Sequence, residues 1–361
     1  MGVRIADMVI DLALLLEDGM FATGSLNAFM EQGPQRWAEV RERIASAAAG
    51  NLPDDAVHAL PEAELALPFA VADYVDFYAS EHHARNLGRL FRPDAEPLLP
   101  NWKHLPVGYH GRAGTVVVSG TDVTRPAGQR KAPKDALPTF GPSQKLDIEA
   151  ELGFVVGAPS PSGRPITPDA FADHVFGVVL LNDWSARDIQ AWEYVPLGPH
   201  LGKSFATSIS AWVTPLAALA SARIPTPPQD PTPLPYLQGV QPWGLDIDLE
   251  VSWNGAVVSR PPYRTIYWSP AQMLAHMTIN GAKSRTGDLF GSGTISGPER
   301  AQRGAFIELT WGGVEPVDVN GESRTFLQDG DEVAITATAP GPGGRRIGLG
   351  EVAGRIVPAR S

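Results

Sequence analysis

The residues most able to carry chemistry in this sequence are acids that adjoin buried apolar runs. Asp183 ends one such run, and Glu149 and Glu151 come just before another. Asp76 lies among aromatic residues in the segment DYVDFY. A spacing of two puts Glu149 and Glu151 on one face of a strand, where buried carboxylates repel each other unless a cation is present. All-oxygen ligation suits a hard ion, so these acids indicate a Ca²⁺ or Mg²⁺ site.

A plainer interpretation of the same acids stays open. Glu149 and Glu151 could lie on the solvent-facing side of an edge strand, because exposure is the usual state of charged side chains. Asp183 weighs against that interpretation, since an acid at the end of a buried strand is costly unless something pairs with it.

Basic and amide side chains follow Asp183 within a short stretch of chain. Arg187 and Gln190 are three residues apart, so they share one face of an expected helix. Lys203 lies in GPHLGKS, which resembles a phosphate-binding loop but has three residues between its glycines where that motif needs four. We therefore exclude nucleotide binding and interpret Lys203 as a cation aimed at the site opposite Asp183. The alternative is a surface lysine.

Two adjacent histidines and one distant acid are candidates for general acid–base catalysis. His83 follows His82 in DFYASEHHARN, and either could be an ordinary core residue. Glu308 alternates with apolar neighbours in AFIELTW, a pattern that predicts a solvent-facing residue of a strand over 306–311. A histidine held by a carboxylate is a common general base for water, but the sequence does not pair Glu308 with either histidine.

Composition excludes several classes of function. The chain has 361 residues, 43% of them hydrophobic, with a net charge of −11 and no cysteine. A chain this acidic, without a basic run, is a poor partner for nucleic acid or an anionic membrane. Disulfides and thiol catalysis are impossible, and no apolar run approaches the roughly 20 residues of a membrane helix. We expect a soluble, cytoplasmic protein.

The pattern of elements predicts an α+β fold that is mainly β. The scattered 37 glycines and 34 prolines fit many short strands joined by turns. An apolar stripe predicts a helix over Pro34–Ala49, and Ser80 is placed to cap a helix that runs to residue 91. Clean alternation predicts a strand over 245–253, ending in an Asn254-Gly255 hairpin. We place a domain boundary at the end of a polar, proline-containing stretch, giving domains 1–67 and 68–361.

Several of these segments together resemble the fumarylacetoacetase family. The matching segments are DFY-x4-H at 76–83, PNWKHLPVGYHGR at 100–112, LDIEAE at 146–151, NDWSARDIQAWEYVPLGPHLGKSFAT at 182–207 and SGTISGPE at 292–299. The resemblance extends from about residue 73 to near the C-terminus and includes the spacings between motifs. Shorter members of the superfamily share the acids but are less similar over 182–207.

The resemblance implies a role for each candidate residue. Metal ligands for Ca²⁺ or Mg²⁺ would be Asp76, Glu149, Glu151 and Asp183. Asp183, Lys203 and Thr207 match positions of a further Mg²⁺, with Lys203 taking part through its backbone carbonyl. Catalytic residues would be His83 as the base, Glu308 as its orienting acid, and Arg187, Gln190 and Lys203 as oxyanion donors. Substrate would be held by Tyr78, Arg92, Gln190, Tyr194 and Thr294. His82 matches no family position.

The resemblance also implies a fold, a reaction and an assembly. The fold would be a small N-terminal SH3-like barrel before a large roll of mixed β-sheets. In the family roughly thirty residues, the order of a few strands, precede the first strand seen here, so we expect this barrel to be incomplete or its start to lie upstream. The reaction would be metal-dependent hydrolysis of 4-fumarylacetoacetate to fumarate and acetoacetate, the last step of tyrosine and phenylalanine catabolism, by a homodimer. The alternative is another superfamily reaction on a β-diketo or 2-oxo acid, catalysed by an acylpyruvate hydrolase, decarboxylase or isomerase.

Overall fold

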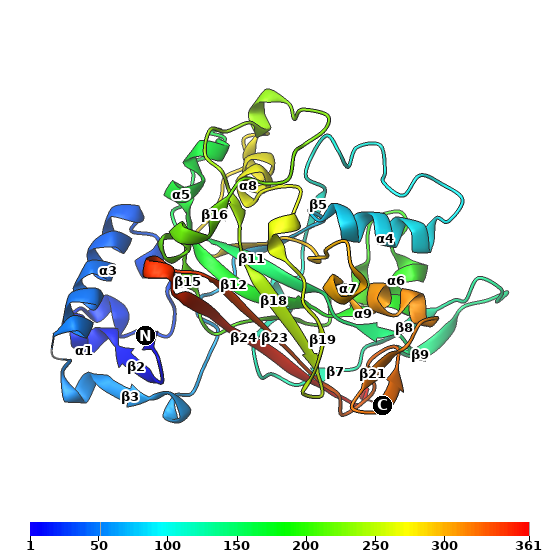
Figure 1. Ribbon diagram of the computed structural model, residues 1–361, viewed down its shortest axis with the longest axis horizontal. Helices are drawn as coiled ribbons and strands as arrows, with labels where there is room; N and C mark the ends of the chain where they lie inside the picture. The colour runs from blue at the N-terminus through cyan, green and yellow to red at the C-terminus, as the bar shows by residue number, and fades with distance from the viewer. Residues whose placement is uncertain (51, 361) are drawn as a thin grey trace.

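A computed structural model describes residues 1–50 and 52–360 as an α+β fold dominated by two β-sheets (Figure 1). The eight-stranded sheet has the order β5 (Gly108–His110), β4 (Asp73–Phe77), β20 (Asp288–Gly291), β11 (Ala150–Val156), β12 (Val175–Asp183), β14 (Thr207–Ile209) and β6 (Val116–Val118), and β15 (Thr214–Pro215) also pairs with β12. The five-stranded sheet has the order β19 (Ala256–Ser259), β18 (Asp248–Trp253), β23 (Glu332–Pro340), β24 (Arg346–Val357) and β7 (Val123–Thr124). Both sheets mix parallel and antiparallel pairs, which confirms the expected mainly β roll.

Strand β12 is apolar on both faces because both faces are covered. Val178 and Leu180 belong to a core shared with the five-stranded sheet. Val179 and Leu181 belong to a second core, which they form with the N-terminal segment. Strands buried on both sides have continuous apolar sequences rather than alternating ones. This is why the apolar run before Asp183 marks the centre of the fold.

The N-terminal segment forms a small unit beside the main body (Figure 1). It contains a three-stranded antiparallel sheet of β1 (Gly2–Ile5), β2 (Met8–Asp11) and β3 (Val57–Ala59). Helices α1 (Leu12–Leu16), α2 (Asn27–Met30) and α3 (Pro34–Ala49) belong to the same unit. The limits of α3 are those predicted. The incomplete SH3-like barrel expected for this unit stays a prediction.

Short helices gather at the end of the sheets where the candidate residues lie (Figure 1). They are α4 (Glu81–Phe91), α6 (Arg187–Glu193), α7 (His200–Lys203) and α9 (Phe306–Leu309). Ser80 caps α4 as predicted, with its hydroxyl accepting from the His83 amide. The predicted β18–β19 hairpin is also confirmed, with left-handed φ values of 50° at Asn254 and 78° at Gly255.

The predicted strand over 306–311 is wrong. Residues Phe306–Leu309 form α9, and a 3-10 turn follows at Trp311–Gly313. The amides of Phe306 and Ile307 donate to the carboxylate of Asp147 at 2.7 and 3.1 Å, so they take part in no sheet. A contact from a distant part of the chain therefore overrides the alternating pattern of AFIELTW.

Two further helices lie away from these residues. They are α5 (Phe171–His174) and α8 (Pro270–Thr278), the latter begun by Ser269 in a capping box. Among the residues that the structure describes, no helix has the length and hydrophobicity needed to span a bilayer.

Candidate active site

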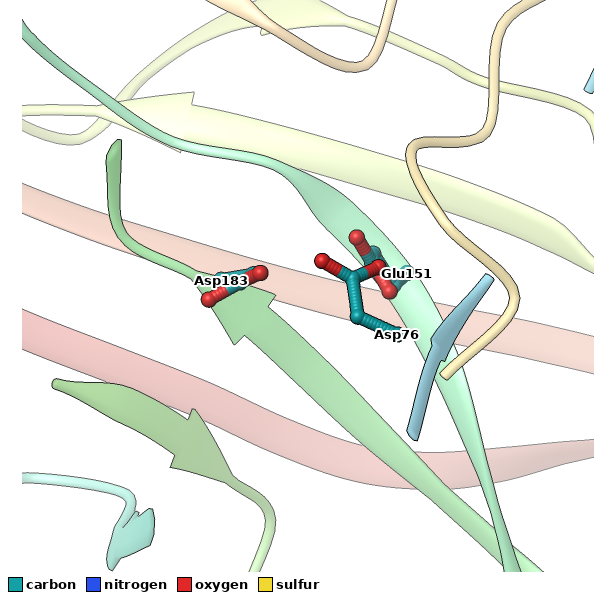
Figure 2. A group of neighbouring side chains, drawn as sticks. All are labelled: Asp76, Glu151 and Asp183. Atoms are coloured by element: carbon teal, nitrogen blue, oxygen red, sulfur yellow. The ribbon is translucent and has the colours of Figure 1, made fainter. Parts of the chain in front are cut away.

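Three of the predicted acids meet at the centre of the eight-stranded sheet. Figure 2 shows Asp76 from β4, Glu151 from β11 and Asp183 from the end of β12 pointing toward one another. Each offers an oxygen within 4.8 Å of the others, and all three side chains are buried. Gly291 of β20 lies between β4 and β11, where a Cβ would come within 2.7 Å of Glu151 Oε2. The glycine therefore leaves the space in which the carboxylates meet.

The electrostatics of this cluster fit a bound divalent cation. Burial, with the neighbouring charge of Asp76, raises the pKa of Glu151 well above its usual value. Burial likewise raises the pKa of Asp76 to about 6, although Arg112 opposes this shift. Glu151 accepts from the Gly293 amide at 3.0 Å, but its Oε1 is buried without a hydrogen-bond partner among the described residues. A hard cation would satisfy that oxygen and relieve the repulsion.

Glu149 lies beside this cluster, but it is paired with two basic side chains, those of Lys203 and Arg187. Lys203 Nζ lies 2.5 Å from Glu149 and 3.0 Å from Asp183, and Arg187 lies 2.8 Å from Glu149. Burial alone would raise the pKa of Glu149, but Lys203 and Arg187 lower it well below the usual range. Thr207 donates to the other oxygen of Asp183 at 3.1 Å. The interpretations of Glu149 and Glu151 as solvent-facing and of Lys203 as a surface lysine are wrong, since all three are buried.

Arg187 has one free donor held in place by its other contacts. Its Nε donates to Asp147 at 2.7 Å, and its Nη1 contacts Gln190 at 3.1 Å and Glu149 at 2.8 Å. Arg187 and Gln190 therefore share one face of α6, as predicted. Nη2 is buried with no partner in the described part of the chain. A fixed, unpaired donor of this kind can receive developing negative charge on a substrate.

His83 pairs with Glu308, although they lie far apart in the sequence. His83 Nδ1 is 2.6 Å from Glu308 Oε2. Asn86 and Ser296 donate to the same carboxylate at 2.8 and 2.9 Å. Burial alone would raise the pKa of Glu308, but these partners lower it. The carboxylate is thus ionised and accepts from Nδ1, which leaves Nε2 of His83 as the acceptor. His82 is only half-buried and makes no such contact in the described structure.

The structure brings only some of the predicted substrate-binding residues to the site. The ring of Tyr78 packs edge-on against His83, 5.2 Å between centroids, and burial raises its pKa. Thr294 is buried, and its hydroxyl lacks a partner among the residues described. Arg92 donates to the Pro97 carbonyl at 3.0 Å, while its charge favours the ionised form of Tyr78. Tyr194 is 47% exposed, at the outer end of α6.

Two charged residues of the site were not identified from the sequence. Arg112 Nη2 lies 2.8 Å from Asp76 and 3.0 Å from Asp183, so it fixes two of the clustered acids. Asp147 holds Arg187 and the start of α9. Both lie inside segments that resemble the family, and Asp147 precedes Glu149 by the same spacing of two that drew attention to Glu149 and Glu151.

Comparison with known proteins identifies the family of this chain. Residues 73–357 match the family model described as fumarylacetoacetate (FAA) hydrolase C-terminal, and residues 1–68 match fumarylacetoacetase N-terminal. The fumarylacetoacetases of Arabidopsis thaliana and Homo sapiens are each 44% identical to this chain, covering 99% of it and 91% of their own length. The fumarylacetoacetase of Rattus norvegicus is 45% identical, covering 100% of this chain and 92% of its own.

Solved structures share the fold at low sequence identity. A fumarylacetoacetate hydrolase from Exiguobacterium antarcticum has a TM-score of 0.60 at 17% identity, covering 99% of this chain and 95% of its own. A maleylpyruvate hydrolase from Sphingobium has a TM-score of 0.58 at 15% identity, covering 99% and 96%. These two structures support the fold alone, whereas the whole-chain identity and the two family models decide membership. The chain belongs to the fumarylacetoacetase family.

Proposed function

We propose that this enzyme hydrolyses 4-fumarylacetoacetate, cleaving a carbon–carbon bond to give fumarate and acetoacetate. The observation that carries the proposal is identity of about 44% over nearly the whole chain with proteins named fumarylacetoacetase. The His83–Glu308 pair beside a buried acidic cluster supplies what a hydrolysis needs, a base for water and a place for a cation.

Asp76, Glu151 and Asp183 would hold Ca²⁺ or Mg²⁺, with Glu149 completing the acidic shell. Asp183, Lys203 and Thr207 would hold a further Mg²⁺, with Lys203 taking part through its backbone carbonyl. The side chains of Lys203 and Thr207 both contact Asp183. When bound, the metal supplies Lewis-acid polarisation of the diketone oxygens.

His83 begins the reaction as the general base. Because Glu308 accepts from Nδ1, Nε2 takes a proton from water. The water oxygen attacks the carbonyl carbon next to the fumaryl group. The free Nη2 of Arg187, with Gln190 and Lys203 close by, donates to the oxyanion that forms.

The carbon–carbon bond then breaks as the oxyanion collapses. The bonding electron pair stays with the acetoacetate carbon, which takes the proton that His83 carries, and the acyl carbon leaves as fumarate. Tyr78, Arg92, Gln190, Tyr194 and Thr294 would hold the substrate. Of these, Thr294 has the strongest support, because its hydroxyl is buried and unpaired in the described structure.

Incubation of the purified enzyme with fumarylacetoacetate and Ca²⁺ tests the proposal. Equal amounts of fumarate and acetoacetate are expected, and a chelator should stop their release. Release of CO₂ without fumarate, or of an isomerised product, would instead support a decarboxylase or isomerase. Those reactions would use the acids but need no water activation by His83 and Glu308.

We also propose that the protein is a homodimer. Large apolar side chains are exposed around α6 and on the hairpin of β8 (Ala127–Arg130) and β9 (Thr139–Pro142), which adjoins α6 through a Trp192–Gln129 hydrogen bond. These exposed residues are Leu137, Phe140, Trp192, Val195, Leu197 and Leu201. Light scattering should give twice the chain mass, and Leu197→Asp should lower it. A mass of one chain at all concentrations would refute the dimer.

The division into domains 1–67 and 68–361 is a proposal too. It is supported by the separate family-model matches to residues 1–68 and 73–357. Limited proteolysis should cut first between residues 52 and 67, and first cuts elsewhere would contradict the division. The cytoplasmic location also stays a proposal, which cell fractionation would test.

A further inference from the structure

Asp147 is a buried carboxylate that the mechanism above does not use. It ends β10 (Leu146–Asp147) and has no exposed surface. Its oxygens accept from Arg187 Nε at 2.7 Å and from the amides of Ile148, Phe306 and Ile307 at 2.8, 2.7 and 3.1 Å. One carboxylate therefore binds groups from three separate segments of the chain.

One of these contacts fixes the plane of the Arg187 guanidinium. With Nε on Asp147 and Nη1 on Glu149 and Gln190, the free Nη2 has a single direction. The backbone supports the same placement, because β10 pairs with β13 (Ser185–Ala186), which directly precedes Arg187. Loss of the Nε contact would leave the guanidinium free to rotate about its remaining partners.

The other contacts fix the start of α9. The first amides of a helix have no partner within it, and Ala305 provides no side-chain cap for α9. Asp147 binds two of these amides, those of Phe306 and Ile307. The next residue is Glu308, which orients His83.

We propose that Asp147 is a positioning residue that couples the oxyanion donor Arg187 to the helix that carries Glu308. The carboxylate holds the two halves of the catalytic machinery at a fixed separation. This inference rests on the proposed function for its catalytic consequence. The tether itself, by which we mean the contacts of Asp147 with Arg187 and with the α9 amides, does not depend on the substrate.

The competing explanation is a buried ion pair that serves stability alone. The chain offers a matched control in Asp331, which is also buried, pairs with the buried Arg324, and accepts from the Gln328 amide and from Asn254. None of these partners belongs to the proposed site. Asp147→Asn and Asp331→Asn thus make the same chemical change, but only the first removes a carboxylate that connects Arg187 to α9.

Both variants should unfold at a lower temperature, but only Asp147→Asn should lose activity. The new side chain has one acceptor oxygen in place of two. In the position that now accepts from Arg187 and the Ile307 amide, that oxygen leaves an NH₂ facing the Phe306 amide; in the other position, it loses both Arg187 and Ile307. We expect kcat for fumarylacetoacetate to fall about 100-fold, the size of effect that a displacement of about 1 Å produces. KM and the Ca²⁺ affinity measured by calorimetry should change little. Asp331→Asn should keep the wild-type kcat.

Hydrogen exchange measured by mass spectrometry reports directly on the hydrogen bonds between Asp147 and the α9 amides. The amides of Phe306 and Ile307 should exchange at least about tenfold faster in Asp147→Asn than in Asp331→Asn, because local protection follows the bonds that must open. If Asp147→Asn does not fold, Asp147→Asn with Arg187→Gln removes the buried charge pair together. Its exchange is then compared with Asp331→Asn combined with Arg324→Gln.

Wild-type kcat in Asp147→Asn, equal kcat losses in the two variants, or unchanged exchange over α9 would each overturn the inference. A wild-type enzyme that does not cleave fumarylacetoacetate would refute the proposed function instead. In that case, faster exchange at α9 would still support the tether, and unchanged exchange would still refute it.

Discussion

Replacing Glu308 with glutamine removes a buried charge while keeping the shape of the side chain. The carboxylate accepts from His83, Ser296 and Asn86 at 2.6, 2.9 and 2.8 Å. An amide oxygen can keep the first two contacts, and the new NH₂ can face Asn86 if that side chain rotates to present its own oxygen. The substitution therefore tests the charge of Glu308 and leaves the packing around His83 intact.

The expected loss follows from the bond that is weakened. His83 becomes positively charged when it takes a proton from water, so the bond to Glu308 is then between two ions. Hydrogen bonds to charged groups contribute about 1.5–3 kcal/mol. At roughly 1.4 kcal/mol for each factor of ten, kcat should fall between about 10-fold and 150-fold. KM should change little, because Glu308 is buried and is not proposed to touch substrate.

Steady-state kinetics with fumarylacetoacetate should be measured for Glu308→Gln, His83→Gln and the double variant. His83→Gln should cost roughly 10²–10⁴ in kcat, the usual range for a general base. The double variant should be close to the worse single one, since residues that act as a unit are not additive. His82→Gln is the matched control and should leave kcat unchanged. If the free-energy costs of Glu308→Gln and His83→Gln add in the double variant, the two residues do not act as a pair. If only His82→Gln loses activity, the general base is His82.

Three further results are expected of the acidic cluster. Glu151→Gln should weaken Ca²⁺ binding in calorimetry by at least about tenfold, since it removes a charged oxygen ligand; unchanged affinity would exclude Glu151 as a ligand. Gly293→Ala should lower both the melting temperature and the Ca²⁺ affinity. A Cβ at this left-handed position (φ 73°) would collide with the Phe77 carbonyl and displace the amide that donates to Glu151. A wild-type melting temperature and Ca²⁺ affinity would contradict this prediction. The folded pKa of Asp76, about 6, lies above its unfolded value of about 3.9, so this group should cost the metal-free protein stability as the pH rises between these values. Over this window the melting temperature of the metal-free wild type should fall relative to that of Asp76→Asn, and Ca²⁺ should restore it; a wild type that gains relative to Asp76→Asn would contradict the assignment.

Local patterns predicted the elements that local forces determine. The apolar run before Asp183 marks β12 because both of its faces are covered. Pro34 and Gly50 bound α3 because their backbone preferences begin and end a helix there. Asp76, Glu151 and Asp183 were recognisable because acids beside buried strands require a cation or a donor.

The contacts that depend on tertiary structure were not predictable from local pattern. Glu308 follows an alternating pattern but lies in a helix, because Asp147 binds the amides that a strand would have used. The spacing of Glu149 and Glu151 did not show that Glu149 contacts Lys203, whereas Glu151 lies with Asp76 and Asp183. His83 and Glu308 are brought together only by the packing of α4 near α9, and their pairing was predicted from the family resemblance.

The most direct test of the central claim follows the oxygen of water. Cleavage of fumarylacetoacetate in H₂¹⁸O should place one ¹⁸O atom in the newly formed carboxylate of fumarate, because hydroxide attacks the carbonyl next to the fumaryl group. The label should appear at the rate of substrate loss and should stop appearing when a chelator is added. Consumption of the substrate with unlabelled fumarate, or with no fumarate at all, would contradict the claim that this enzyme hydrolyses that carbon–carbon bond.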